Sequence, residues 1–294
     1  DPLSFPDAVA HASIFLTSAQ IRAALIPQTV IVIGRTTLSR SINAFSKLAP
    51  TQIVIDPRMA TVDSDRHADK RFTQLPVLNT HKASPEWLEQ WDKYALRCAK
   101  SIDALTGFTE AVIAKEIAAN LPEGSTLFVS SSRPIRDLEG FATPRSGVTT
   151  HANRGLAGID GNISTALGIA LASKQTFAVL GDLSFLHDLT GLIHREEINC
   201  AFIVINNDGG GIFSTLPQRG VDGFESVFGT PHGLDPAAIA KAMGISATTI
   251  SSVDELKKTL KAPVKGISIV VANVPSRDEN ADSLKAIYES MNSI

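Results

Sequence analysis

Cysteine, tryptophan and tyrosine are scarce in this chain. Its 294 residues include two of each. The cysteines, Cys98 and Cys200, are far apart in the sequence, and Cys200 starts an apolar run that predicts a buried strand. This pattern does not fit a small secreted domain held together by disulfides, and the simpler expectation is a reducing, cytoplasmic location.

Long apolar runs and an excess of either charge are also missing. No apolar stretch approaches the roughly 18–20 residues that a membrane span needs, and no signal peptide is visible. The chain has 27 Lys and Arg against 30 Asp and Glu, a net charge of −3, so the basic surface typical of nucleic-acid-binding proteins is not expected. Hydrophobic residues make up 44% of the chain, which is ample for the packed core of an enzyme of one or two domains.

Two blocks of alternating strands and helices divide the sequence. Residues 1–103 form the first block and residues 104–294 the second. In the first we expect strands at 30–33 and 53–55, helices at 19–25, 39–48 and 85–98, and an irregular segment at 56–78. In the second we expect helices at 108–121, 162–173, 185–195, 236–243, 253–261 and from about 280, and strands at 126–130, 176–180, 200–205 and 266–272. The alternation predicts an α/β fold with a doubly wound parallel sheet, preceded by part of a second α/β domain.

An aspartate and a loop rich in asparagine and glycine follow two of these strands. Residues 176–180 lead into Gly181-Asp182-Leu183-Ser184, and residues 200–205 lead into Asn206-Asn207-Asp208 and three glycines. Because ligands bind at the carboxyl ends of strands in open α/β sheets, this edge is the predicted binding site.

The chemistry of these residues suits a magnesium ion and a phosphate group. The carboxylate of Asp182, the amide oxygen of Asn207 and the carbonyl of Gly209 are the hard oxygen ligands that Mg²⁺ prefers. Glycines let the backbone approach a phosphate closely, and the helix after Gly181 directs its N-terminus toward an anion. An ordinary strand–helix–strand unit with a polar turn, in which Asn207 bonds only to local backbone, is the alternative.

The residues around this edge resemble the diphosphate-binding motif of thiamine diphosphate enzymes, usually Gly-Asp-Gly, a spacer and Asn-Asn. Leu183 replaces the second glycine. Within that superfamily the chain resembles the 2-succinyl-5-enolpyruvyl-6-hydroxy-3-cyclohexene-1-carboxylate synthases of menaquinone biosynthesis, in which leucine is usual at this position. The resemblance is strongest over residues 106–236 and implies the thiamine diphosphate-binding fold. The segments that carry it are 132–137 (SRPIRD), 153–161 (NRGLAGIDG), 181–188 (GDLSFLHD) and 206–213 (NNDGGGIF).

This resemblance implies thiamine diphosphate together with Mg²⁺, or Mn²⁺, as cofactors. Asp182, Asn207 and Gly209 match the metal ligands of the family. Ile159 matches the apolar residue that wedges under the cofactor and bends it, although a plain core isoleucine is the alternative. Ala157 matches a residue whose carbonyl meets the cofactor amine. The remaining positions expected to contact the cofactor are Gly181, Leu183, Ser184 and Gly210.

The substrates that the resemblance implies are 2-oxoglutarate and isochorismate, which are both dicarboxylates and therefore suit arginine side chains. Arg136 and Arg154 match the substrate arginines of the family, with Ser132 one turn before Arg136. Arg40 matches a basic position of the central domain, although Ser39 stands where family members can have lysine. For each arginine a solvated surface position is the alternative. The apolar wall against the isochorismate ring would be Ile212, Phe213 and Leu216, with core packing as the alternative for Phe213.

The family has three domains, and the chain matches only two of them. Residues 1–103 resemble the later part of the central domain and residues 104–294 the diphosphate domain, so the N-terminal pyrimidine-binding domain is expected to be absent from this chain, which begins with Asp1. In the family, a glutamate of that domain, from the partner subunit, activates the cofactor. No general base is therefore assigned here. We expect a full-length homodimer or homotetramer, and an isolated chain that is inactive, binds cofactor poorly and self-associates.

The implied activity is that of a transferase. It decarboxylates 2-oxoglutarate and adds the resulting carbanion to isochorismate in a 1,4-addition, which gives 2-succinyl-5-enolpyruvyl-6-hydroxy-3-cyclohexene-1-carboxylate and CO₂. Two alternatives stay open. One is another thiamine diphosphate carboligase or decarboxylase, such as acetolactate synthase, which rarely needs a dicarboxylate pocket. The other is a non-catalytic cofactor-binding fragment.

Overall fold

The computed structural model describes residues 2–35, 38–58, 67–77, 84–153, 157–193 and 197–292. The chain divides into two compact units. Unit 1 comprises Asp1–Ala10 and Ala104–Ala286, and unit 2 comprises His11–Asp103 and Ile287–Ile294. Each unit has its own parallel sheet.

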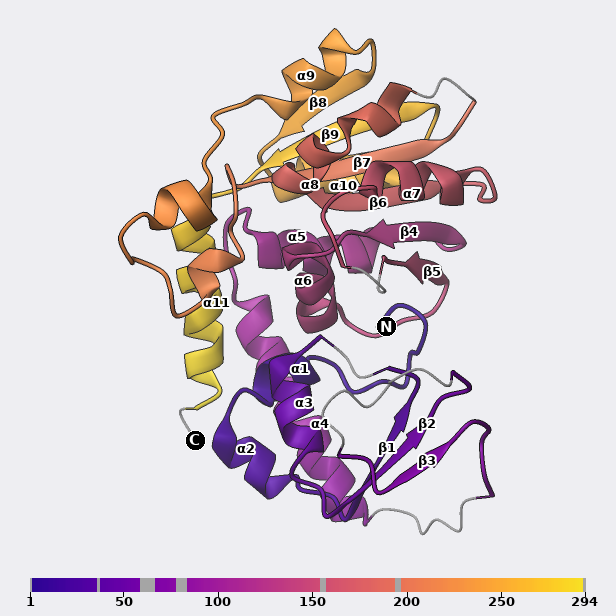
Figure 1. Ribbon diagram of the computed structural model, residues 1–294, viewed down its shortest axis with the longest axis vertical. Coiled ribbons are helices and arrows are strands. Elements are labelled where there is room, and N and C mark those ends of the chain that lie inside the picture. Colours follow the sequence, from indigo (N-terminus) through magenta and orange to yellow (C-terminus); the bar gives the residue numbers. More distant parts are fainter. Residues whose placement is uncertain are drawn as a thin grey trace. The chain divides into compact units, whose positions relative to one another are not determined.

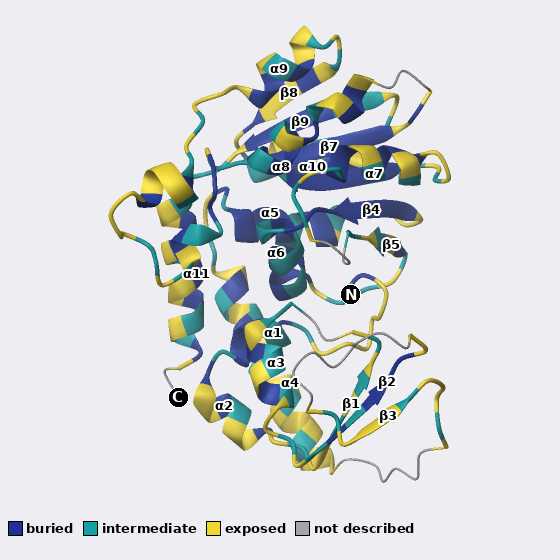
Figure 2. Cartoon of the chain, in the orientation of Figure 1, coloured by how far each residue is buried: buried dark blue, intermediate teal, exposed yellow. Residues whose placement is uncertain are grey.

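Unit 1 is built on a sheet of six described strands in the order β5-β4-β6-β7-β9-β8 (Figure 1), and every neighbouring pair is parallel. The strands are β4 (Ser125–Val129), β5 (Val148–His151), β6 (Thr176–Gly181), β7 (Cys200–Asn206), β8 (Ser246–Ile250) and β9 (Ile267–Asn273). The central strands β6 and β7 are buried almost throughout, whereas the edge strand β8 is partly exposed (Figure 2). Burial on both faces is the reason why the central strands are apolar without alternation.

Helices cover both faces of this sheet. They are α5 (Glu110–Asn120), α6 (Arg133–Phe141), α7 (Asn162–Ala170), α8 (Asp182–His187), α9 (Pro236–Ala242) and α10 (Val253–Lys261). The unit also contains the short turns η1 (Leu189–Ile193), η2 (Phe213–Thr215) and η3 (Glu225–Gly229) and most of helix α11 (Arg277–Ser290). One core cluster contains side chains of α5, α6 and α10, and the other contains side chains of α7, α8 and α9. Successive strand residues alternate between the clusters, as Phe177 and Ala178 do. The predicted doubly wound α/β fold is confirmed.

Most predicted elements of unit 1 are present, and their ends follow local chemistry. The helix predicted at 253–261 is α10 itself, and the helix predicted at 236–243 is α9. Asp235 caps α9 as expected, since its Oδ1 accepts the backbone N–H groups of Ala237 and Ala238 at 2.8 and 3.1 Å.

The helix predicted at 185–195 was wrong in extent. The α-helix begins earlier, at Asp182, and ends at His187, and the 3₁₀ turn η1 follows it. The cause is tertiary: the carboxylate of Asp188 accepts the backbone N–H (2.8 Å) and hydroxyl (3.2 Å) of Ser164 on α7. Holding Asp188 against α7 breaks the helix there.

Several short elements were not predicted from the sequence. In unit 1 these are the edge strands β5 and β8 and the helix α6; in unit 2 they are α1 (Ala12–Phe15) and β3 (Lys70–Phe72), which lies inside the segment expected to be irregular. Edge strands carry weak apolar signals because one side of each is solvated.

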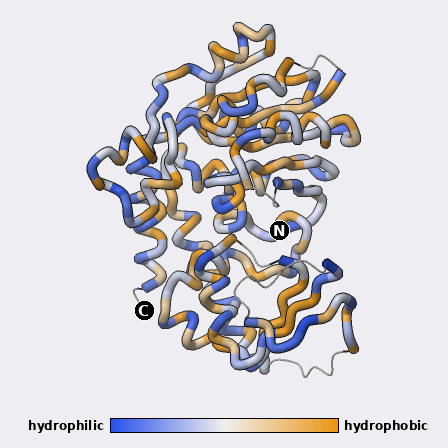
Figure 3. The backbone as a smooth tube through the Cα atoms, viewed as in Figure 1, coloured by the Kyte–Doolittle hydropathy of each residue, from blue (hydrophilic) through white to orange (hydrophobic). Residues whose placement is uncertain are grey.

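Unit 2 contains a three-stranded parallel sheet in the order β1 (Thr29–Ile33), β2 (Thr51–Ile55), β3. Apolar residues run along β1 and β2, whereas β3 is largely hydrophilic (Figure 3). Its longer helices are α2 (Ala19–Ala24), α3 (Arg40–Ser46) and α4 (Pro85–Asp103). Trp91 of α4 meets Phe15 and Phe45 edge-on, with ring centroids 5.7 and 5.4 Å apart. Across the described residues of both units, no helix is long and apolar enough to cross a membrane.

Candidate functional site

A pocket lies in unit 1 at the carboxyl ends of β6 and β7, where the two halves of the sequence motif meet. Eleven of the predicted site residues line it. From the cofactor and metal sets these are Ile159, Gly181, Asp182, Leu183, Ser184, Asn207, Gly209 and Gly210, and from the substrate set Ser132, Ile212 and Phe213. The edge of the sheet that the motif predicted is thus a pocket in the folded unit.

The remaining predicted residues lie elsewhere or cannot be placed. Among the described residues, Ala157, Arg136 and Leu216 are not part of the pocket lining. Arg136 lies on α6, and its Nη1 donates to the carbonyl of Ser132 at 2.6 Å. Arg154 lies outside the described residues. The roles of these residues stay predictions.

Arg40 belongs to unit 2, where it is exposed and is the first residue of α3. The hydroxyl of Ser39 before it accepts the backbone N–H of Ile42 at 3.3 Å. Ser39 therefore caps the helix, which is a structural reason for a serine at this position. The role of Arg40 in substrate binding stays a prediction.

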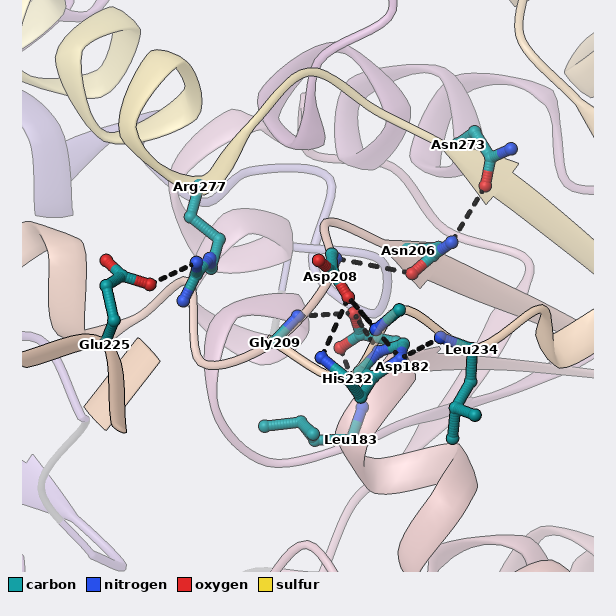
Figure 4. A network of polar contacts seen from close by, with 11 residues as sticks. Asp182, Leu183, Asn206, Asp208, Gly209, Glu225, His232, Leu234, Asn273 and Arg277 are labelled. Carbon is teal, nitrogen blue, oxygen red and sulfur yellow. Dashed lines mark hydrogen bonds and ion pairs between the residues drawn. The ribbon is translucent and has the colours of Figure 1, made fainter. Parts of the chain in front are cut away.

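Asp182 is buried at the start of α8, and its carboxylate joins three segments of the chain (Figure 4). Oδ1 accepts the backbone N–H of Leu183 at 2.7 Å. Oδ2 accepts the backbone N–H of Gly209 at 2.8 Å and lies 3.2 Å from Nε2 of His232. Burial raises the pKa of Asp182, against the opposing effect of these donors. A carboxylate can accept about four hydrogen bonds, two at each oxygen. Oδ2 has two partners and Oδ1 has one, so Oδ1 retains one acceptor position for a cation.

His232 is a site residue that the sequence did not reveal. The backbone N–H of Leu234 donates to its Nδ1 at 3.0 Å, so in this arrangement the ring proton is on Nε2, which donates to Asp182. The backbone N–H groups of His232 and Gly233 donate to Oδ1 of Asp208 at 3.0 and 2.8 Å. Burial raises the pKa of Asp208, but these N–H donors act in the opposite direction, and the pKa stays below its usual value. No sequence motif predicts His232, because it meets Asp182 only where its loop packs in the folded unit.

Asn207 has a hydrogen-bond partner that the sequence did not reveal. Its Nδ2 donates to Oε1 of Glu110, a buried residue in the first turn of α5. Its Oδ1 is also buried and has no hydrogen-bond partner among the described residues. Glu110 follows Thr109, which caps α5, so in the sequence it looks like an ordinary acidic residue at a helix start.

Glu110 belongs in turn to a buried charge cluster. Nε of Arg133 donates to Oε2 of Glu110 at 3.3 Å, and Nη2 of Arg133 pairs with Oδ1 of Asp137 one turn along α6. Burial raises the pKa of Asp137 to about 7; the nearby arginines Arg133 and Arg136 oppose this shift and the charge of Glu110 adds to it. Two carboxyl groups therefore share the guanidinium of Arg133 beside the pocket.

The glycines after Asn207 are needed for close backbone packing. A Cβ on Gly209 would lie 2.1 Å from the carbonyl oxygen of Gly229, and one on Gly210 would lie 2.2 Å from that of Phe228. Gly209 also has a φ of 132°, in the region that favours glycine. The N–H of Gly210 donates to the carbonyl of Gly229 at 2.7 Å. The segment η3, which the glycines pack against, is joined to α11 by the ion pair of Arg277 with Glu225 at 2.6 Å (Figure 4).

One wall of the pocket is apolar and includes Ile159, Ile212 and Phe213. Ser184 secures the backbone at Ile159, since its hydroxyl donates to the carbonyl of Ile159 and accepts from Nδ2 of Asn162, both at 2.9 Å. The ring of Phe213 packs against that of Phe228, with centroids 5.3 Å apart. The pocket thus combines a polar end at Asp182 with an apolar wall.

The donor set fits a hard divalent cation bound together with a phosphate. Asp182 supplies a carboxylate with a remaining acceptor position, and Oδ1 of Asn207 is a buried oxygen without a partner, which is costly unless something binds it. Within the described parts of the chain, no group of three or more His, Cys, Asp and Glu side chains could hold a metal ion. A cation at this site would therefore use amide and backbone oxygens as well as Asp182.

Comparison with known proteins finds similarity to thiamine pyrophosphate enzymes along most of the chain. The family model described as "Thiamine pyrophosphate enzyme, C-terminal TPP binding domain" matches residues 137–274. The model described as "Middle domain of thiamine pyrophosphate" matches residues 1–129. These two matches together account for most of the chain.

Curated relatives give a closer comparison. The 2-succinyl-5-enolpyruvyl-6-hydroxy-3-cyclohexene-1-carboxylate synthase of Thermobifida fusca (strain YX) is 37% identical over 246 residues, covering 80% of this chain and 44% of the relative. The synthase of Lysinibacillus sphaericus (strain C3-41) is 35% identical over 295 residues, covering 94% of this chain and 51% of the relative. The chain spans about half the length of these relatives. The chain is similar to the middle domain and the C-terminal cofactor-binding domain of thiamine pyrophosphate enzymes, and it resembles the 2-succinyl-5-enolpyruvyl-6-hydroxy-3-cyclohexene-1-carboxylate synthases over most of its own length.

Proposed function

We propose that this chain supplies the diphosphate- and metal-binding half of a thiamine diphosphate-dependent transferase that acts on 2-oxo acids in menaquinone biosynthesis. In the full-length protein the reaction would convert 2-oxoglutarate and isochorismate into 2-succinyl-5-enolpyruvyl-6-hydroxy-3-cyclohexene-1-carboxylate and CO₂. The opposite wall of the site would come from the pyrimidine-binding domain of a partner subunit in a homodimer or homotetramer.

One observation carries this proposal. The carboxylate of Asp182 and the unpartnered Oδ1 of Asn207 belong to one pocket, at the carboxyl ends of adjacent parallel strands. This position is where open α/β sheets bind ligands, and a carboxylate with an amide oxygen suits a magnesium ion that takes its other oxygen ligands from a diphosphate and water. The sequence similarity to synthases over 80–94% of the chain supports the same assignment.

Each part of the pocket has a task in this proposal. Asp182, Asn207 and the carbonyl of Gly209 would hold Mg²⁺, and the N-terminus of α8 would face the diphosphate. Bound thiamine diphosphate supplies an electron sink for decarboxylation. Ile159 would support the cofactor from below, and Ser184 would hold the backbone of Ile159 in place. Ile212 and Phe213 would exclude water from the ring of the second substrate.

The charge of the substrates defines the rest of the site. Both proposed substrates carry two carboxylates, which arginine binds through paired N–H groups. Arg154 and Arg40 are the proposed carboxylate partners, with Arg136 and Ser132 on the side of α6. These residues would favour dicarboxylate substrates over those of an acetolactate synthase, which have fewer carboxylates.

Calorimetric titration of the 294-residue chain with thiamine diphosphate, with and without Mg²⁺, tests the cofactor assignment. We expect weak binding that depends on Mg²⁺, and its loss in Asp182→Ala, because this change removes the only anionic protein ligand of the proposed metal. Asp188→Asn is the matched control: it is buried just after the same helix but bonds to Ser164 instead. Binding that ignores Mg²⁺, or that survives in Asp182→Ala, would contradict the proposal.

The reaction is tested on the full-length protein. Incubation with 2-oxoglutarate, isochorismate, thiamine diphosphate and Mg²⁺ should release CO₂ and form the coupled product. Formation of acetolactate from pyruvate, with no use of isochorismate, would favour the other carboligase instead.

A further inference from the structure

An asparagine side chain can present either of its two ends to a ligand, and only one of them binds a cation. Oδ1 is an acceptor and Nδ2 a donor, and half a turn of the amide exchanges them at almost no steric cost. Asn207 is oriented for metal binding before the cation arrives only if a neighbouring group disfavours this exchange. A group that selects the orientation of Asn207 would therefore raise the affinity of the proposed metal site.

Glu110 is in the position to make this selection. Nδ2 of Asn207 donates to Oε1 of Glu110, which leaves Oδ1 as the free atom. An ionised carboxylate only accepts hydrogen bonds, so the NH₂ end of the amide must face Glu110 whichever way the amide was first placed. The chemistry of the pair thus fixes the orientation.

The other side of Glu110 is held as well. Nε of Arg133 donates to Oε2 at 3.3 Å, and the Arg133 side chain is itself 13% exposed and paired with Asp137. The backbone N–H of Glu110 donates to Oδ1 of Asn280 at 3.0 Å. With its backbone and both side-chain oxygens engaged, the carboxylate of Glu110 has a defined position from which to orient its neighbour.

We propose that Glu110 is a positioning residue of the metal site, which turns Asn207 so that Oδ1 faces the cation. This inference rests on the proposed function and adds a residue to it: Glu110 would not touch the metal and would act through Asn207. Partners that orient the ligands of a metal commonly matter for affinity by factors of about 10 to 100.

The test is Glu110→Gln, which keeps the volume of this buried side chain. Gln has a single acceptor oxygen, and the charged guanidinium of Arg133 is the stronger competitor for it. The NH₂ end of Gln then faces Asn207 and attracts Oδ1 away from the cation. We expect the affinity for Mn²⁺, measured by water proton relaxation with thiamine diphosphate present, to fall about 10- to 100-fold.

Thr109→Ala is the matched control for a purely structural effect. Thr109 precedes Glu110 and caps the same helix, since its Oγ1 accepts the N–H of Val112 at 3.4 Å. Its loss removes a helix cap and should lower the thermal midpoint, yet leave the Mn²⁺ affinity within about twofold. Equal losses of affinity in both variants, or an unchanged affinity in Glu110→Gln, would overturn the inference.

A second measurement needs no metal. The side-chain NH₂ resonances of Asn207, identified by their loss in Asn207→Ala, should show slow hydrogen exchange in the metal-free chain. This protection should disappear in Glu110→Gln but persist in Thr109→Ala. Absence of protection in the wild-type chain would overturn the inference by itself. Failure of the wild-type chain to bind Mn²⁺ would instead contradict the proposed metal site, so the two failures are distinguishable.

Discussion

Nε2 of His232 lies 3.2 Å from Oδ2 of Asp182, although fifty positions separate the two residues in the sequence. The backbone N–H of Leu234 occupies the other ring nitrogen of His232. This arrangement makes His232 a donor to the buried carboxylate. The loop that carries His232 is thereby connected to the start of α8.

Replacement of His232 by alanine should destabilise unit 1. The buried carboxylate of Asp182 would lose a donor, and hydrogen bonds to charged groups contribute about 1.5–3 kcal/mol. We expect the free energy of unfolding in urea to fall by about 1–3 kcal/mol. His187→Ala is the control, because His187 is exposed at the end of α8, the helix that begins with Asp182. Surface substitutions usually change the free energy of unfolding by less than about 0.5 kcal/mol. Equal effects of the two substitutions would contradict the role given to His232.

Two glycines, Gly209 in the loop after Asn207 and Gly168 in α7, give a prediction with opposite signs. Gly209→Ala should destabilise strongly, by about 2 kcal/mol or more, because its Cβ would meet the carbonyl of Gly229 at 2.1 Å and its φ is 132°. Gly168→Ala should stabilise by about 0.5–1 kcal/mol, since Gly168 is exposed within α7 with nothing near its Cβ. Thermal and urea unfolding of both variants measure this. Destabilisation by Gly168→Ala, or none by Gly209→Ala, would contradict the packing.

The buried carboxyl of Asp137 should make stability depend on pH. Burial raises its folded pKa to about 7 from 3.8, and its Oδ2 has no hydrogen-bond partner among the described residues. The contribution of Asp137 to the free energy of unfolding is therefore fully present below about pH 4. It is lost as the pH rises through about 7, because Asp137 releases its proton at a lower pH in the unfolded state than in the folded state. A tenfold change in a protonation equilibrium corresponds to about 1.4 kcal/mol, so the dependence should be measurable.

Asp137→Asn removes this titration. We expect the wild-type chain to lose unfolding free energy relative to Asp137→Asn between pH 4.5 and pH 7.5, as measured in urea at both values. A difference that is constant, or that grows in favour of the wild type as the pH rises, would show that Asp137 is ionised in the folded protein at low pH.

Arg154 gives a prediction about substrate choice in the full-length protein. A charge-assisted hydrogen bond contributes about 1.5–3 kcal/mol, so Arg154→Ala should lower kcat/KM for 2-oxoglutarate by roughly 10- to 100-fold. The same change should have little effect on pyruvate, which lacks the second carboxylate. Equal losses with both substrates would indicate misfolding or a role in cofactor binding.

The sequence by itself determined the fold class and the edge of the sheet where the pocket lies. Short apolar runs such as 176–180 and 200–205, each followed by a polar turn, predict buried strands, and the helix between them predicts that the strands are parallel. Asp182 and Asn207 were predictable for the same reason, because residues that follow parallel strands meet at one edge. Local chemistry also determined helix starts, as at Asp235.

Tertiary structure alone decided which distant side chains complete the site. Glu110 comes from the start of α5 and His232 from a loop, and neither has a spacing to Asp182 or Asn207 that any period predicts. The same holds for the break after α8, where Asp188 bonds to Ser164 of α7. Periodicity reports which face of an element is buried. It carries no information on which polar atoms meet once separate elements pack, because that depends on the distances between those elements in the folded unit.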